Sequence, residues 1–190
     1  LIAMLFAASS MQENEGTVIF VAAVDEEGNA TGIKNLVKNK PEIDYAIFGE
    51  PSSIQKVTIA YKGRLAINLK ISVENSAHAS APWLAKNAIE ETAIVVKDLK
   101  NNLEGGQENK TKGMMLTASL TEIRGGTSHN ITPKECIATM DIRIPVDMNC
   151  NSVEEKITTS INEISSKRGI EILYSVVDET EPFEAAHNSA

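Results

Sequence analysis

The chain has 190 residues, of which 42% are hydrophobic and 23% charged, a balance typical of a folded protein with one or two domains. Its formal net charge of −8 at pH 7 argues against nucleic acid as a partner, because phosphate binding needs clustered lysine and arginine. Two cysteines, Cys136 and Cys150, are too few for a disulfide framework and lack CxxC spacing, so we expect free thiols in a reducing, cytoplasmic compartment.

Residues 1–50 predict a helix, a strand, a second helix and a second strand. Ile2, Leu5 and Phe6 recur at the spacing of a core helix, and no basic residue precedes them as in a signal peptide. No apolar run reaches the roughly 18 residues that a membrane span needs, so we expect no membrane partner. Because Leu1 starts directly inside the helical pattern, we expect the chain to be a segment of a longer protein.

The two strands predicted in this part are short and almost wholly apolar. They read "TVIFVAAV" at 17–24 and "YAIF" at 45–48, and "GIKNLVKNK" between them reads as a helix that stops before Pro41. Continuous apolar strands of this kind are typical of parallel sheets that are covered on both faces. We therefore expect a βαβ unit, which is too small to be stable without the rest of its sheet.

From about residue 57 the pattern changes to alternation. In "LAINLKISV" at 65–73 every second residue is apolar, as in a strand with one buried face. Similar strands are expected in "MLTASLTEI", "IATMDIRI" and "IEILYSVV", with helices in "LAKNAIEETAIVVKDLKNNL" and behind a Ser152–Glu155 capping box, the latter ending near Gly169. The order β-α-β-β-α-β predicts a ferredoxin-like domain with both helices on one face of an antiparallel sheet.

The predicted fold class is therefore α/β plus α+β. Residues 1–56 would form part of an α/β domain, because they contain the βαβ unit. Residues 57–179 would form the ferredoxin-like domain. Residues 180–190 would return into the first domain.

Acidic residues follow both apolar strands. Asp25, Glu26 and Glu27 come directly after the first strand, and Glu50 stands in "FGEPSS" after the second. Open α/β sheets bind ligands beyond the carboxyl ends of their parallel strands, so Glu27 and Glu50 could converge there. Adjacent carboxylates repel each other unless a cation bridges them. This favours a divalent metal site, with Glu26 as the base for a metal-bound water.

Both features also have a purely structural interpretation. Acidic residues after a strand commonly cap the next helix, here near Thr31. The Glu50-Pro51 pair is ordinary turn chemistry. The acidic string alone does not decide between a metal site and a helix cap.

Four motifs together point to a family. They are "VDEEG", "DYAIFGEPSS", "SAHASAPW" and "GGTSHNITPKECIATMDIRIP", in this order. The sequence resembles the co-catalytic zinc amidohydrolases, which include acetylornithine deacetylase, succinyl-diaminopimelate desuccinylase, aminoacylase and glutamate carboxypeptidase. Within that family it is most similar to enzymes that release lysine or ornithine from an amino-group carrier protein. The resemblance implies a partial zinc-peptidase catalytic domain at 1–56 and a lid and dimerisation domain at 57–179.

The resemblance also implies roles for the acidic residues. Glu26 matches the family's general base, which activates the water between two zinc ions, with cobalt as a possible substitute. Glu27 and Glu50 each match a ligand of one zinc ion. The family's His-x-Asp motif, bridging aspartate and last histidine have no counterpart in this chain, and two carboxylates leave a tetrahedral zinc shell half empty. We therefore expect the 190-residue chain to be inactive by itself.

Three residues of the second domain match further family positions. His78 matches a histidine that stabilises the oxyanion, often across a dimer interface, and Asn130 and Arg143 match residues that hold the substrate's carboxylate. Each has a plainer interpretation. His78 could be a surface histidine, Asn130 a turn residue, and Arg143 a partner of Asp141 or Glu135 on a solvated sheet face.

Two functional hypotheses remain open. In the first, the parent protein is a zinc-dependent amide hydrolase of lysine or arginine biosynthesis, acting on a carrier protein or on a small N-acyl amino acid such as N-acetylornithine. A desuccinylase or a carboxypeptidase of the same family is an alternative within this class. In the second, the chain is a non-catalytic dimerisation and substrate-clamping module. Either protein would be a homodimer through the helix in "LAKNAIEETAIVVKDL" and an edge strand.

Overall fold

The computed structural model divides into two compact units, Leu1–Val57 and Thr58–Ala190, which are described separately. None of the helices in the described part of the chain is both long and apolar enough to cross a membrane. The structure describes residues 2–12, 16–26, 28, 30–39, 41–49 and 58–186.

The first unit contains two short helices, α1 (Ile2–Ser9) and α2 (Thr31–Asn39). Both helices were predicted, and α2 begins one residue before the predicted run. Neither helix contributes to a core, because none of the described residues of this unit is buried. Phe6, which the spacing assigned to a buried face, is 72% exposed.

The two apolar strands predicted for the first unit are not formed in its described residues. Val24 is 70% exposed and Ile47 is 86% exposed, so these runs are not covered on either face. A parallel strand is stabilised by a hydrogen-bonded neighbour and by layers packed on both faces. The described residues of this unit supply neither, and the expected βαβ unit is therefore absent from them.

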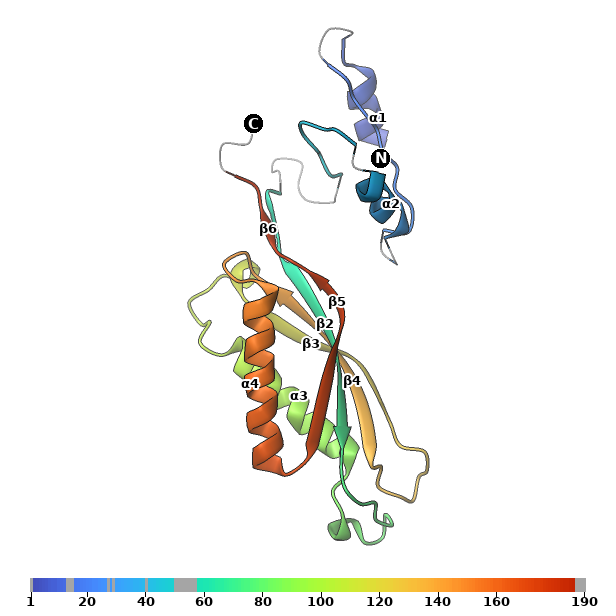
Figure 1. The fold of residues 1–190 in the computed structure, drawn as a ribbon, viewed down its shortest axis with the longest axis vertical. Coiled ribbons are helices and arrows are strands. Elements are labelled where there is room, and N and C mark those ends of the chain that lie inside the picture. The colour runs from blue at the N-terminus through green and yellow to red at the C-terminus, as the bar shows by residue number, and fades with distance from the viewer. Residues whose placement is uncertain are drawn as a thin grey trace. The chain divides into compact units, whose positions relative to one another are not determined.

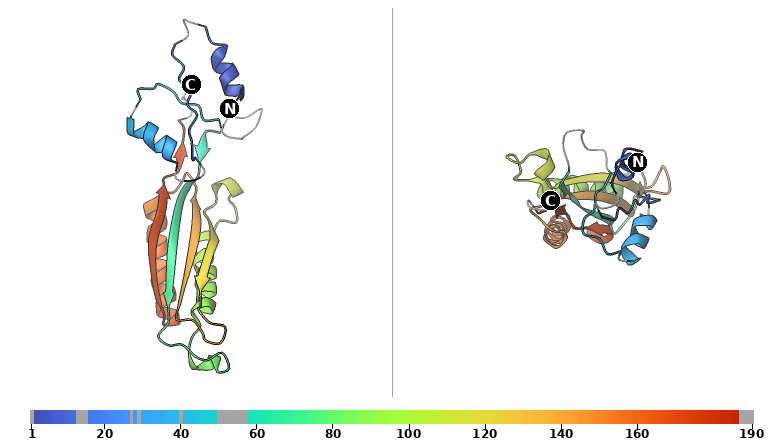
Figure 2. Two further views of the ribbon diagram at one scale, coloured as in Figure 1. Left: turned by 90° about the vertical axis from the view of Figure 1, so that its right-hand side faces the viewer. Right: turned by 90° about the horizontal axis from the view of Figure 1, so that it is seen from above.

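The second unit is built on a four-stranded antiparallel sheet. Its strands are β2 (Gly63–Ser72), β3 (Thr117–Gly125), β4 (Glu135–Ile144) and β5 (Glu171–Thr180), in the spatial order β3-β4-β2-β5. Helices α3 (Ala88–Glu104) and α4 (Cys150–Arg168) cover the same face of the sheet (Figures 1 and 2). This arrangement confirms the predicted ferredoxin-like β-α-β-β-α-β fold.

The core lies between the sheet and these two helices. In β2, residues at every second position are fully buried, namely Leu65, Ile67, Leu69 and Ile71. They form one cluster with apolar side chains of both helices, including Val95, Leu99, Val153 and Ile157. The alternate residues of β2 are polar or small and point to the opposite face, which the helices do not cover. The period of two in the sequence thus marks the buried face correctly.

The helix ends differ in detail from the predicted ones. Helix α3 begins at Ala88 because the side chain of Asn87 accepts a hydrogen bond from the Ile89 N–H (3.0 Å). The capping box of helix α4 is formed by Asn149 and Ser152. The expected Ser152–Glu155 box is therefore wrong, because the helix begins three residues earlier than that box implies. Its other end is as predicted: Gly169 adopts the left-handed conformation that commonly terminates helices.

A short ribbon extends strands β2 and β5 beyond the sheet. It consists of β1 (Ala60–Tyr61) and β6 (Phe183–Glu184), which pair antiparallel. Two single-turn 3₁₀ helices complete the unit, η1 (Pro82–Leu84) after β2 and η2 (Lys112–Met114) before β3.

Candidate functional site

Two of the predicted site residues, His78 and Asn130, lie side by side at one end of the sheet. The loop after β2 and the loop before β4 meet there through a single antiparallel bridge between His78 and Ile131. The Ala79 N–H donates to the backbone carbonyl of Asn130 (2.8 Å). We call this region the tip, defined as residues 77–84 and 128–132.

A buried threonine holds the two loops of the tip together. The Ala77 N–H donates to Oγ1 of Thr132 (2.8 Å), and the Thr132 N–H donates back to the Ala77 carbonyl (2.9 Å). Both residues are buried, so this pair of hydrogen bonds is protected from water. The position of His78 next to Asn130 is therefore fixed by the backbone.

The imidazole of His78 is exposed and is held from one side. Its Nδ1 lies 2.8 Å from Oγ of Ser80 and accepts a hydrogen bond from the Ser80 N–H (3.2 Å). The Ala81 N–H donates to the His78 carbonyl (2.8 Å), which closes a turn under the ring. Within the described residues no hydrogen bond reaches Nε2.

The surroundings of these two residues combine polar and apolar groups. Oδ1 of Asn130 accepts a hydrogen bond from Oγ of Ser128 (2.6 Å). Trp83 and Leu84 of η1 are 78% and 71% exposed, and Ile131 is 50% exposed. The tip thus presents an imidazole and an amide among apolar side chains that its own domain does not cover.

Arg143 lies at the opposite end of the sheet. Its guanidinium contacts the carboxylate of Asp141 at 2.6 and 3.3 Å, as in the plainer interpretation, and Asp141 also accepts from Nε of Arg64 (3.0 Å). The other expected partner, Glu135, pairs instead with Lys70 (2.7 Å). Arg143 is about half exposed, so its contact with Asp141 is open to competition from a bound anion.

A lysine adds to the positive charge beside Arg143. Nζ of Lys62 donates to the carbonyls of Met115 (2.6 Å) and Lys112 (3.1 Å). Partial burial lowers the pKa of Lys62, and the nearby charge of Arg143 lowers it further. Lys62 therefore anchors the loop of η2 to the start of β2 next to Arg143.

The two ends of the sheet are too far apart to form one site within a chain. Glu135 at the tip end and Arg143 are eight residues apart on β4. At about 3.3 Å per residue this corresponds to roughly 26 Å. The structure thus brings His78 and Asn130 together and leaves Arg143 apart from them.

The acidic residues of the first unit are only partly described. Glu26 is exposed, and Glu27 and Glu50 lie outside the described residues. Asp25 has a positive φ of 59° and accepts hydrogen bonds from the Thr31 hydroxyl and, at its carbonyl, from the Ala30 N–H (2.7 Å). Asp25 thus joins the acidic turn to the start of α2.

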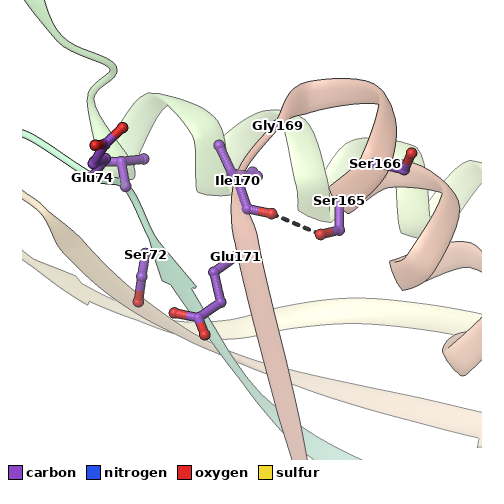
Figure 3. A pocket seen from close by; sticks show the side chains of 8 residues that line it. Ser72, Glu74, Ser165, Ser166, Gly169, Ile170 and Glu171 are labelled. Carbon is purple, nitrogen blue, oxygen red and sulfur yellow. Dashed lines mark hydrogen bonds between the residues drawn. The ribbon is translucent and has the colours of Figure 1, made fainter.

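A pocket in the described part of the second unit lies away from the tip. It has a volume of about 590 Å³ and lies between the end of β2 and the end of α4 (Figure 3). Two polar groups of its lining are hydrogen-bonded to each other, since Oγ of Ser165 donates to the Ile170 carbonyl (2.7 Å). Its lining contains none of the predicted site residues: Ser72, Val73, Glu74, Ser165, Ser166, Gly169, Ile170 and Glu171.

One group of potential metal ligands occurs elsewhere in the second unit. Sγ of Cys150 and carboxylate oxygens of Glu179 and Glu181 lie within 4.8 Å of one another. Two of the three already make structural contacts, since Glu181 accepts from the Cys150 N–H (3.0 Å) and the thiol donates to the Thr180 carbonyl (3.6 Å). Cys150 and Cys136 are both free and buried.

The sequence reasoning missed Ser80 and Thr132, which hold the tip in place. The signal for Ser80 is its position two residues after His78 and two before Pro82, where short polar side chains favour turns. Thr132 carries no comparable signal, because its partner Ala77 is distant in the sequence.

Comparisons with known proteins agree with this fold. The family model described as the peptidase dimerisation domain of M20 proteins matches residues 59–168. A solved putative amidohydrolase/peptidase from Burkholderia cenocepacia superimposes with a TM-score of 0.56 at 16% identity, over 68% of this chain and 31% of its own. This likeness concerns the fold.

Curated relatives are similar over the whole chain. The proteins named LysW-lysine/LysW-ornithine hydrolase from Saccharolobus solfataricus and Sulfurisphaera tokodaii are 29% and 30% identical over 100% of this chain. The chain spans about half the length of these relatives, 49% in both cases.

Proposed function

We propose that this chain, which belongs to the family of the M20 peptidase dimerisation domain, is part of an amide hydrolase that releases lysine or ornithine from a carrier protein. Membership in the family confirms the resemblance to amidohydrolases and peptidases. The main support for this activity is that the chain is similar, over its whole length, to relatives named for that reaction. Deacetylase, desuccinylase and carboxypeptidase activities lack this support, because neither of these relatives bears such a name.

The domain assignment follows from this proposal. Residues 57–179 are the lid and dimerisation domain, residues 1–56 are part of the catalytic domain, and residues 180–190 return into it. The whole protein acts in the cytoplasm in lysine or arginine biosynthesis. Its substrates are the LysW carrier protein or a small N-acyl amino acid.

A dimer would form at the β3 edge of the sheet, against which α3 packs. Leu120 and Ile123 lie on the outer strand β3 and are 42% and 45% exposed, although they point to the helix-covered face. Ile89 of α3 packs next to Gly125 at the same edge and is also partly exposed. We call Ile89, Leu120 and Ile123 the edge surface. Apolar side chains beside an unpaired edge strand favour association with a second copy.

Two-fold pairing at this edge would unite the separated site residues. A two-fold axis aligns β3 antiparallel with the partner's β3, which reverses the direction of the partner's sheet. The partner's His78 and Asn130 then lie at the same end of the joined sheet as Arg143 of the first chain. The separation of roughly 26 Å within one chain supports a site assembled from two chains.

The proposed roles follow from the chemistry of each side chain. The imidazole of His78 donates a hydrogen bond to the oxyanion that forms when the amide carbonyl is attacked. The Asn130 amide and the Arg143 guanidinium hold the substrate's carboxylate, for which Arg143 exchanges its contact with Asp141. Glu26 takes the proton of the attacking water and passes it to the leaving amine.

The metal ligands proposed here do not form a complete site. Glu27 and Glu50 supply two carboxylates, whereas zinc in proteins takes four ligands. We therefore assign to these residues part of a zinc site in the whole protein, with cobalt as a possible substitute, and derive no step through the metal. The 190-residue chain alone acts as a dimerisation and substrate-clamping module without hydrolytic activity.

The test compares the full-length protein with the 190-residue chain on carrier-bound lysine, with zinc measured by elemental analysis. The full-length protein should release lysine and hold about two zinc ions, and the shorter chain should do neither. Glu26→Gln in the full-length protein should abolish release while zinc stays bound, because only the base is removed. Release of lysine by the 190-residue chain, or by the E26Q protein, would contradict the proposal.

A further inference from the structure

We propose that Ser80 is a positioning residue that fixes the imidazole of His78 in the tautomer with its proton on Nε2. The inference about the ring stands on the tip geometry alone. Its consequence for catalysis rests on the proposed function.

The contacts of Nδ1 decide the tautomer. The Ser80 N–H points at Nδ1 from 3.2 Å, and a backbone N–H can donate but never accept. Nδ1 must therefore offer its lone pair, and a proton on Nδ1 would face the N–H directly. The Ser80 hydroxyl, at 2.8 Å, then donates to the same lone pair. In a neutral imidazole this leaves the proton on Nε2.

Backbone hydrogen bonds of the tip hold the Ser80 N–H next to Nδ1 of His78. The turn from His78 to Ala81 is closed by a hydrogen bond of 2.8 Å between its ends, which places the Ser80 N–H under the ring. Pro82 follows and restricts the conformation of Ala81. The hydrogen bonds between Ala77 and Thr132 fix the start of the same turn. The ring therefore has an orienting partner within its own loop.

The fixed tautomer suits an oxyanion donor. An N–H group at Nε2, on the exposed side of the ring, can donate to a developing negative charge without reorganising first. The other tautomer would present a lone pair at that position, which repels an oxyanion. Ser80 thus acts on the reaction through His78 and does not touch the substrate.

Nitrogen NMR of the 190-residue chain with ¹⁵N-labelled histidine tests the tautomer directly. At about pH 8.5, above the usual titration range of histidine, the ring nitrogens of His78 should show the limiting shifts of the Nε2–H form. The exposed His129, whose ring makes no hydrogen bond within the described residues, should show values averaged over both forms. His129→Gln and His187→Gln variants assign the signals.

Ser80→Ala removes the hydroxyl contact at 2.8 Å but keeps the backbone N–H that also points at Nδ1. The His78 shifts should therefore move part of the way, and not completely, toward the averaged values of His129. Ser128→Ala is the matched control, because Ser128 contacts Asn130 in the same tip and leaves the His78 ring alone. Ser80→Thr, which keeps the hydroxyl, should restore the limiting shifts. A His78 ring protonated on Nδ1, or one that Ser80→Ala leaves unchanged, would overturn the proposal.

Turnover of the full-length protein gives a second readout. Ser80→Ala should lower kcat roughly tenfold with little change in KM, a fraction of the loss that removal of a whole oxyanion donor causes. Ser80→Thr should recover most of it. The expected NMR shifts without a change in kcat would leave the positioning role intact and refute the catalytic role of His78. An unchanged NMR pattern refutes the positioning role whatever the activity.

Discussion

At the residue scale, the thiol of Cys150 shows how burial and neighbouring charge act together. Burial raises the pKa of Cys150 to about 11, and the carboxylates of Glu181 and Glu179 raise it as well. The protonated thiol is also the form that can donate to the Thr180 carbonyl. The folded chain therefore keeps this proton at a pH at which the unfolded chain, with an ordinary thiol, has lost it.

The sign of the resulting pH dependence follows from proton linkage. Below about pH 9 the thiol is protonated in both states, so its contribution to stability is fully present and does not change with pH. Between about pH 9 and 11 only the unfolded chain loses the proton, so the free energy of unfolding falls as pH rises. We predict that the thermal midpoint drops over this range and that Cys150→Ser makes the drop smaller.

Alkylation provides an independent check on the same thiol. At about pH 8, Cys150 in the folded chain should react with iodoacetamide far more slowly than it does in denaturant, because the thiolate is the reactive form. Rapid modification of the folded chain would show that the thiol is neither buried nor held protonated.

At the element scale, Gly63 lets strands β2 and β5 continue into the ribbon of β1 and β6. A Cβ at this position would lie 2.6 Å from Cδ and N of Pro182 and 2.7 Å from the Thr180 carbonyl oxygen. These are rigid backbone and ring atoms, so the strands would have to separate. Gly63→Ala is expected to lower the free energy of unfolding by about 1–3 kcal/mol, as overpacking commonly does.

Chemical denaturation of the 190-residue chain measures this loss. The matched control is Gly113→Ala, because no atom lies within 4 Å of a Cβ built there. That variant should be neutral to within about 0.5 kcal/mol, as is usual for surface substitutions. Equal effects of the two substitutions would show that the close approach to Pro182 is not what requires glycine.

Individual strands and helix ends differ in how far the sequence alone predicts them. The alternation in β2 predicted its buried face because the period of a strand is a local property. The strands expected at 17–24 and 45–48 depend on neighbours and covering layers, which a local pattern does not contain. The start of α3 was misplaced because Asn87 caps the helix three residues inside the apolar pattern.

The candidate site was predictable only in part for a related reason. Family motifs proposed His78, Asn130 and Arg143 as site residues one by one. Their arrangement depends on the register of β2 with β4, which pairs Arg143 with Arg64 and leaves the tip at the other end. No spacing along the sequence contains that register. Ser80 acts through hydrogen bonds to a ring nitrogen, which becomes visible only in three dimensions.

At the scale of the whole molecule, the edge surface should decide the oligomeric state. We predict that the 190-residue chain sediments at micromolar concentration with twice the mass of one chain. Ile123→Asp should convert it to the monomer, because a charge beside an apolar edge strand opposes pairing. The domain should stay folded, since Ile123 is already 45% exposed. Leu173→Asp, on the open face of the sheet and 55% exposed, is the matched control and should leave the dimer intact.

Mixing two inactive full-length variants then tests whether the dimer completes the site. If the site uses Arg143 of one chain and His78 of its partner, a mixed dimer of Arg143→Ala and His78→Ala chains keeps one intact site. Random exchange gives half mixed dimers, so about a quarter of the wild-type turnover should return. Adding Ile123→Asp to both chains should prevent this recovery, because it removes the interface and no catalytic group. If the mixture stays inactive while the chains demonstrably exchange, Arg143 and His78 do not act together across the two-fold axis.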